Sequence, residues 1–247
     1  LMGFTGKTLE AANFLLADAL LDDNPRREKH RALGESIVAT FMQLNMSPPE
    51  GEGYTFATGE TATRRGWNRL YLRVLCDGHK ELLKAIRRER RAGINHEDWL
   101  EWSRSFGDWL LLQQDERGGF PRYWEPGTGR VIDASTNSSY NAILYLVLLS
   151  ELTGDNRYGE AALKTGEFSW NISQPDGVFT GGTIDNPDVI DKEAGTLSLE
   201  GYLALFSYTS DREWLERAMA AANFAETWIY IWGVPMPDDE DDSDLHW

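Results

Sequence analysis

The sequence predicts an all-α fold in which eight helices are joined in pairs as helical hairpins. Four short turns carry similar text, short connections alternate with long ones, and no segment shows the apolar–polar alternation typical of a strand. The expected helices cover residues 6–22, 25–46, 61–92, 95–116, 135–153, 156–173, 189–208 and 211–232.

A repeating unit supports this expectation. The turns share one aligned position, occupied by Asp23, His96, Asp155 and Asp211, so that successive units are 73, 59 and 56 residues apart. Eleven positions later each unit has a small residue, namely Gly34, Gly107, Gly166 and Ala222. A small residue at a fixed place lets neighbouring helices approach closely. The period corresponds to one helical hairpin with its loops.

Helix ends and apolar spacing support the individual elements. The segment "ASTNSSYNAILYLVLLSELTGD" begins with residues that cap helices, continues as an apolar run and stops at Thr-Gly-Asp. The segment "DREWLERAMAAANFAETWIYIW" has apolar or small residues at helical spacing. The basic run "KAIRRERR" closes the helix of residues 61–92, because cations favour the negative end of a helix dipole.

Connection lengths predict where functional residues gather. The turns within hairpins are short, at residues 22–24, 93–94, 154–155 and 209–210. The connections between hairpins are long, at residues 47–60, 118–134, 175–188 and after Gly233, and they combine glycine with aromatic or acidic residues. Alternate connections of antiparallel helices lie at opposite ends, so all the long loops are expected at one end. Long loops on a rigid scaffold are where sites are expected.

Composition and motifs exclude several functions. The formal net charge of −16 disfavours nucleic acid and anionic membrane as partners. No apolar run reaches the roughly 20 residues that span a bilayer, and the single Cys76 forms no internal disulfide. The four histidines are scattered, and no metal or cofactor is predicted. We expect a water-soluble protein. Both ends of the sequence look truncated, so an export signal could have been lost, and the sequence does not decide between a periplasmic, a secreted or another location.

The alternating connections and the segments "WLLLQQDERGGF" and "LTGDNRYGEAA" resemble an α/α toroid. Within that group the chain is most similar to six-hairpin glycosidases and related polysaccharide lyases. The resemblance implies one domain over residues 1–247, truncated at both ends, with about four of six expected hairpins. Missing chain segments or a partner would supply the rest of the ring. It also implies inner helices beginning near Thr61, Ser135 and Val189, with a cleft at their N-terminal ends.

Sugar chemistry on this scaffold needs carboxylates as acid, base or nucleophile, and aromatic rings that stack on sugars. Asp188 and Asp191 are the predicted acid and base; being three apart, they would face the same side if both are already helical. The further catalytic candidates are Glu193 and Glu125. The predicted substrate-binding residues are Tyr123 and Trp124 for stacking, together with Glu60, Arg122, Tyr140 and Asp185. The competing explanation is helix N-capping for the acids and core packing for the rings.

Three functions follow from these residues. The first is a glycoside hydrolase that cleaves a poly- or oligosaccharide. The second is a polysaccharide lyase in which Tyr140 donates a proton and Arg122, Arg64 or Arg65 neutralises a uronate carboxylate. The third is a non-catalytic helical module that binds glycan or protein.

Overall fold

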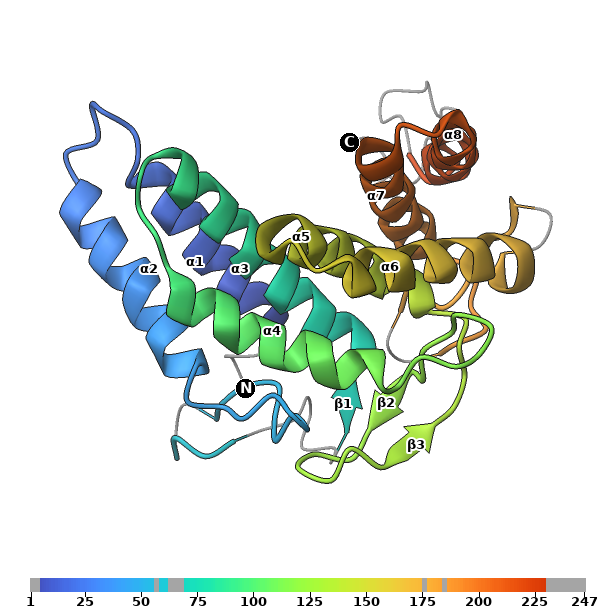
Figure 1. Ribbon diagram of the computed structural model, residues 1–247, viewed down its shortest axis with the longest axis horizontal. Helices are drawn as coiled ribbons and strands as arrows, with labels where there is room; N and C mark the ends of the chain where they lie inside the picture. Colours follow the sequence, from blue (N-terminus) through green and yellow to red (C-terminus); the bar gives the residue numbers. More distant parts are fainter. Residues whose placement is uncertain (1–4, 56–57, 62–68, 175–176, 184–185, 230–247) are drawn as a thin grey trace, which may run out of the picture.

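The computed structural model describes residues 5–55, 58–61, 69–174, 177–183 and 186–229. Across these residues the chain forms the eight expected α-helices, in the expected order (Figure 1). They are α1 (Thr5–Asp18), α2 (Arg27–Phe41), α3 (Leu72–Arg91), α4 (Glu97–Leu111), α5 (Ile143–Thr153), α6 (Asn156–Phe168), α7 (Lys192–Thr209) and α8 (Arg212–Glu226). No described helix has the length and apolar character needed to cross a membrane.

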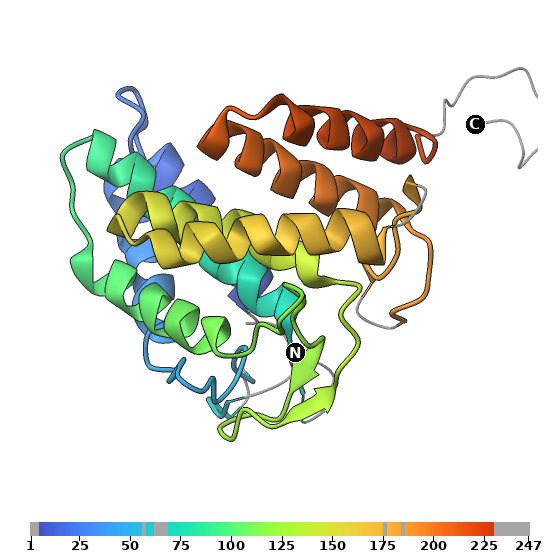
Figure 2. The same cartoon turned by 45° about the vertical axis from the view of Figure 1, so that its right-hand side comes forward.

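The helices form an arc of two layers. The odd-numbered helices pack in series, α3 between α1 and α5, and α5 against α7. We call α1, α3, α5 and α7 the inner layer. Each inner helix also packs against the next helix in the chain, which builds an outer layer of α2, α4, α6 and α8. In Figure 2 the hairpin of α7 and α8 (orange and red) lies beside that of α5 and α6 (yellow). The predicted series of hairpins is confirmed.

The repeated small residues lie where helices touch. A Cβ added at Gly34 would be 2.8 Å from the Leu16 side chain on α1. One added at Gly107 would be 2.8 Å from the Tyr145 hydroxyl on α5, and one at Gly166 would be 2.7 Å from the Trp214 ring on α8. Real Cβ atoms essentially never approach this closely, so the close approach predicted from the repeat is confirmed at these positions.

The three described long loops contact one another at the N-terminal ends of the inner helices. Leu70 and Tyr71 (β1) pair with Tyr123 and Trp124 (β2), which pair in turn with residues 131–133 (β3). This antiparallel sheet, of order β1-β2-β3 (Figure 1), joins the first two long loops. The Asn137 amide donates to the Pro187 carbonyl and so joins the second loop to the third.

Three expected helix starts are wrong. The helix expected from Thr61 begins at Leu72, because Leu70 and Tyr71 are extended and paired in the sheet. The helix expected from Ser135 begins as a 3-10 turn (η2, Ser139–Ala142) and becomes α-helical at Ile143. The helix expected from Val189 begins at Lys192. The all-α expectation also missed the small sheet, whose two- and three-residue strands are too short to show a period of two.

Candidate functional site

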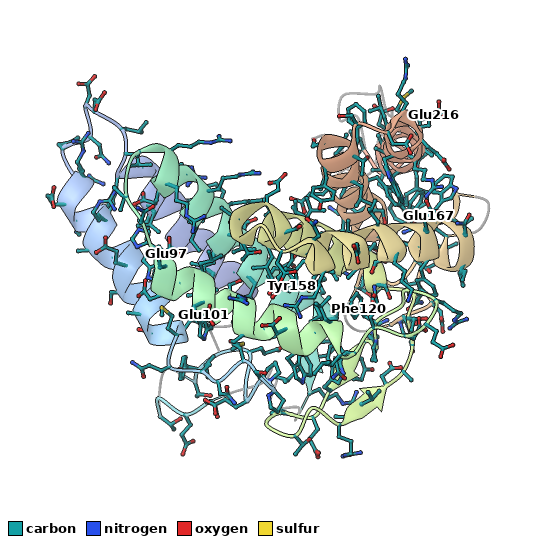
Figure 3. All side chains as sticks on the ribbon, viewed as in Figure 1. Glu97, Glu101, Phe120, Tyr158, Glu167 and Glu216 are labelled. Atoms are coloured by element: carbon teal, nitrogen blue, oxygen red, sulfur yellow. The ribbon has the colours of Figure 1, made fainter. Side chains whose placement is uncertain are left out.

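A polar groove of about 470 Å³ runs along the inner layer between α1, α3 and α7. Its lining is rich in charged side chains from all three helices. They are Lys7 and Glu10 on α1, Arg73, Asp77, Lys80, Glu81, Lys84 and Arg88 on α3, and Glu200 on α7. The carboxylates of the outer layer differ, since Glu97 and Glu101 on α4 are exposed on the outside of the arc (Figure 3). The groove therefore concentrates charge on a concave face.

Ion pairs fix the floor of the groove. Lys80 Nζ lies 2.9 Å from Asp77 on the same helix and 2.7 Å from Glu200 on α7. Lys84 Nζ lies 2.8 Å from Glu81 and 3.0 Å from Glu200. Burial acts to lower the pKa of Lys80, but the charges of Asp77 and Glu200 outweigh it and the pKa is raised. Lys80 is therefore charged at neutral pH, and the ion pairs hold these side chains in one arrangement.

Arg73 organises the mouth of the groove, at the N-terminal ends of α3 and α7. Its Nη1 donates to the Glu193 carboxylate at 2.5 Å and to the Gly182 carbonyl at 2.5 Å, and its Nε lies 3.5 Å from Asp77. The hydrogen bond from Arg73 lowers the pKa of Glu193, although partial burial opposes the shift. Glu193 is thus an ionised carboxylate, 40% exposed, beside the groove.

Asp191 caps α7. One carboxylate oxygen accepts from the Ala194 N–H at 2.9 Å, and the other from the N–H groups of Gly182 at 3.0 Å and Thr183 at 3.3 Å. The residue is 7% exposed. An aspartate that receives three backbone N–H bonds is a structural anchor. For Asp191 the structure supports the capping explanation.

The expectation that Asp188 and Asp191 share a helix face is wrong, because both precede Lys192, where α7 begins. Asp188 is exposed in the loop, and its backbone N–H donates to Asn186 at 2.9 Å. Asp185 lies outside the described residues, as do Arg64 and Arg65.

Two other predicted carboxylates lie in the loops. Glu125 follows β2 and pairs with Arg130 at 2.9 Å across the β2–β3 turn; its hydrogen bonds with Arg130 and Thr128 lower its pKa. Glu60 is exposed, and its carbonyl accepts from the Thr55 N–H at 2.9 Å. Like Asp188 and Glu193, neither residue is among those that line the groove, and neither contacts Arg73, as Glu193 does.

The predicted stacking platform is half wrong. Trp124 has no exposed surface: its ring packs edge-on against Trp109 at 5.1 Å and its Nε1 donates to Gln113 at 3.1 Å. Phe120, labelled in Figure 3, is equally buried. Adjacent strand residues point to opposite faces of a sheet, and Tyr123 is half-buried, 4.9 Å from the Tyr71 ring. Only Tyr123 of this pair presents ring surface.

Arg122 and Tyr140 hold the third long loop against the second. Arg122 is 2% exposed and its Nη2 donates to the Thr183 carbonyl at 2.6 Å. Tyr140 is 1% exposed and its hydroxyl donates to the Thr180 carbonyl at 2.9 Å. Burial, and after it the charge of Asp191, raises the pKa of Tyr140 well above its ordinary value. The predicted residues Arg122, Tyr140, Asp191 and Glu193 are therefore brought together around residues 180–183.

The charged lining of α3 was missed by sequence reasoning. Arg73, Asp77, Lys80, Lys84 and Arg88 recur at spacings of four, three, four and four residues, which places them on one face of a helix. The available signal for the groove was this stripe of acidic and basic residues along a helix that was expected to be an inner one. Inner helices otherwise present apolar or small residues to their neighbours.

No protein-family model matches the chain, and no curated protein matches it. Its structure is similar to that of a GH76 α-mannanase of Bacteroides thetaiotaomicron, with a TM-score of 0.62 and 14% identity over 91% of this chain and 58% of that one. For the unsaturated glucuronyl hydrolase of a Bacillus species the TM-score is 0.62 at 13% identity, over 89% of this chain and 62% of that one. For the cellobiose 2-epimerase of Bacillus thermoamylovorans the TM-score is 0.60 at 10% identity, over 93% of this chain and 62% of that one.

At these identities the likeness shows the fold alone, an α/α toroid of helical hairpins. The chain spans 58% to 62% of the length of these three structures, so it accounts for part of such a ring.

Proposed function

We propose that the chain belongs to a carbohydrate-active enzyme, a glycoside hydrolase that binds a poly- or oligosaccharide in the groove between α1, α3 and α7. The observation that carries this proposal is the ionised Glu193, held by Arg73 at the mouth of the groove. The structures with this fold include an α-mannanase, an unsaturated glucuronyl hydrolase and a cellobiose 2-epimerase, which agrees with a sugar substrate.

Hydrolysis of a glycosidic bond uses one ionised carboxylate and one protonated carboxyl group. Glu193 suits the first role, as nucleophile or general base, because Arg73 stabilises its charged form. We propose Asp188 as the second carboxyl group, which carries over the prediction made from the sequence; it is exposed five residues before Glu193, in the loop that leads into α7. Tyr123 supplies a ring surface at the same end of the inner layer.

The lyase alternative finds less support among the described residues. A tyrosine that transfers a proton to a sugar needs an accessible hydroxyl, whereas that of Tyr140 is buried and donates to the Thr180 carbonyl. We therefore prefer hydrolysis and keep elimination as an outcome of the test.

The test is a screen of the full chain on neutral and acidic polysaccharides, reading new reducing ends and ultraviolet absorbance together. Hydrolysis produces reducing ends without the absorbance of an unsaturated product. We expect Glu193→Gln and Asp188→Asn each to lower kcat by about 100-fold or more, as for loss of an acid or base. Glu101→Gln, at an exposed carboxylate of α4, is the matched control and should keep wild-type turnover.

Absorbing products would favour a lyase, and binding without turnover on any substrate would favour a non-catalytic module. If both site variants turn over like Glu101→Gln, the assignment of Glu193 and Asp188 is wrong even where the enzyme class is right.

A further inference from the structure

A second, much smaller cavity adjoins the groove. It measures about 10 Å³ and is lined by Tyr71, Arg122, Ser138, the chain at Gly181–Thr183 and Arg73, the last of which also lines the main groove. A volume of roughly 10 to 15 Å³ holds one water-sized group. The cavity therefore accepts a single oxygen atom, which belongs either to a water molecule or to a larger group lying in the groove.

Arg122 enters this cavity as a buried cation that forms no ion pair with the described residues, although its guanidinium lies 5.9 Å from the centre of the Tyr123 ring. It is 2% exposed, its Nη2 bonds the neutral Thr183 carbonyl, and its Nη1 has no hydrogen-bond partner among the described residues. The charge of Asp133 interacts with it, but that carboxylate accepts from the Ser135 N–H at 2.8 Å and forms no ion pair with Arg122. A buried charge is costly unless an opposite charge accompanies it.

Ser138 adds a second unused donor. It is 4% exposed, and its Oγ makes no hydrogen bond with described residues. A hydroxyl and a guanidinium N–H that both lack acceptors among the described residues line one cavity, and buried polar groups are normally paired. The missing partner is an acceptor oxygen. A water molecule would satisfy the hydrogen bonds but not the charge of Arg122, so an anionic oxygen fits better.

We propose that this cavity binds one carboxylate oxygen of an acidic sugar whose ring lies in the neighbouring groove. The inference rests on the proposed function and narrows its substrate class to glycans that contain uronate. Arg122 supplies the charge and Ser138 the second hydrogen bond. Arg73, between the cavity and the groove, adds a second guanidinium on the path from carboxylate to ring. Both arginines are specificity residues in this arrangement, and neither is required to move a proton.

The test compares ligands that differ in the carboxylate alone. Thermal unfolding of the full chain is followed with sodium D-glucuronate, D-glucose, sodium sulfate and sodium chloride, the salts at equal ionic strength. We expect glucuronate to raise the unfolding temperature of the wild type in a saturable way and to bind at least about tenfold more tightly than glucose, as for a charged hydrogen bond.

Two variants locate the effect. Arg122→Met removes the charge at similar length and should abolish the preference for glucuronate, while Ser138→Ala should weaken glucuronate binding several-fold without affecting glucose. If Arg122→Met does not fold, Ser138→Ala and the charge-retaining Arg122→Lys, which should keep the preference, carry the test.

Equal binding of glucuronate and glucose by the wild type would overturn the proposal. A preference for glucuronate that survives in Arg122→Met would overturn it as well. If Arg122→Met does not fold, an unchanged preference for glucuronate in Ser138→Ala would overturn it. Equal protection by sulfate or chloride would overturn the carboxylate assignment. The proposed function fails separately: Arg122-dependent glucuronate binding without turnover supports the pocket and counts against the hydrolase.

Discussion

Replacing Gly182 by alanine tests how the third long loop is docked on α7. A Cβ at this position would overlap the backbone nitrogen of Ala194 and would lie 2.9 Å from the backbone carbonyl carbon of Glu193, against 3.4–4 Å for an ordinary contact. These are backbone atoms of the first turn of α7, so no side chain can rotate away. Either the loop or the helix end must move.

The expected cost follows from these contacts. Overpacking of this kind costs about 1 to 3 kcal/mol. Displacement also weakens the bond from the Gly182 N–H to Asp191, worth about 1 kcal/mol. Alanine stabilises by about 0.4 to 1 kcal/mol because it restricts the unfolded chain. The net loss is about 1 to 3 kcal/mol, which lowers the unfolding temperature by roughly 2 to 12 °C for a protein of this size.

The assay is thermal and urea unfolding of Gly182→Ala beside Thr183→Ala. The control changes the next residue without adding an atom to the contact; it removes the hydrogen bond from the Thr183 hydroxyl to the Asn186 carbonyl at 3.3 Å, so it should lose at most about 1 kcal/mol. Equal midpoints for the two variants would refute the argument, since they would mean that the loop does not press on the first turn of α7.

Three further changes test individual side chains. Asp191→Ala should lower stability by about 1 to 2 kcal/mol in urea unfolding, while Asp191→Asn, which keeps an acceptor oxygen for the cap, should lose clearly less. Burial lowers the pKa of His79 to about 3, so its ring signals in NMR should not titrate between pH 8 and 5. In the unfolded chain His79 takes up that proton near the ordinary pKa of 6.5. The free energy of unfolding should therefore fall as the pH drops from about 6.5 to 3, by at most about 1.4 kcal/mol per pH unit. His79→Phe should remove this dependence. Trp124→Phe should lower stability by about 1 to 2 kcal/mol through the lost bond to Gln113 and the lost volume, with sugar affinity unchanged; a selective loss of affinity would restore Trp124 as a stacking residue.

The helices could be predicted because their signals are local. Caps, apolar spacing and the repeated small residues all act within one turn or one hairpin, and the structure places Gly34, Gly107 and Gly166 at helix contacts. The start of α3 was missed because it depends on a distant segment: Leu70 pairs with Trp124 across 54 positions of sequence. Pairing between segments so far apart leaves no periodic pattern in either of them.

The candidate site divides in the same way. Glu193 could be selected from the sequence because it lies in an acidic segment at the start of a predicted inner helix. Asp191 lies in the same segment. The residue types alone do not show that Asp191 caps α7 while Glu193 pairs with Arg73. Trp124 and Tyr123 are also equivalent by composition, and the sheet decides which ring is buried.

The order of residues alone determined that the chain is a series of helical hairpins with its variable loops at one end, since turn chemistry and helical period act between near neighbours. The concave charged groove depends on α1 and α7 lying on either side of the charged face of α3, and the pocket at Arg122 depends on two loops meeting. The contact of Arg73 with Glu193 joins residues more than a hundred positions apart, and the packing of the hairpins sets it. Packing decides which charges lie close together in a region of low dielectric constant.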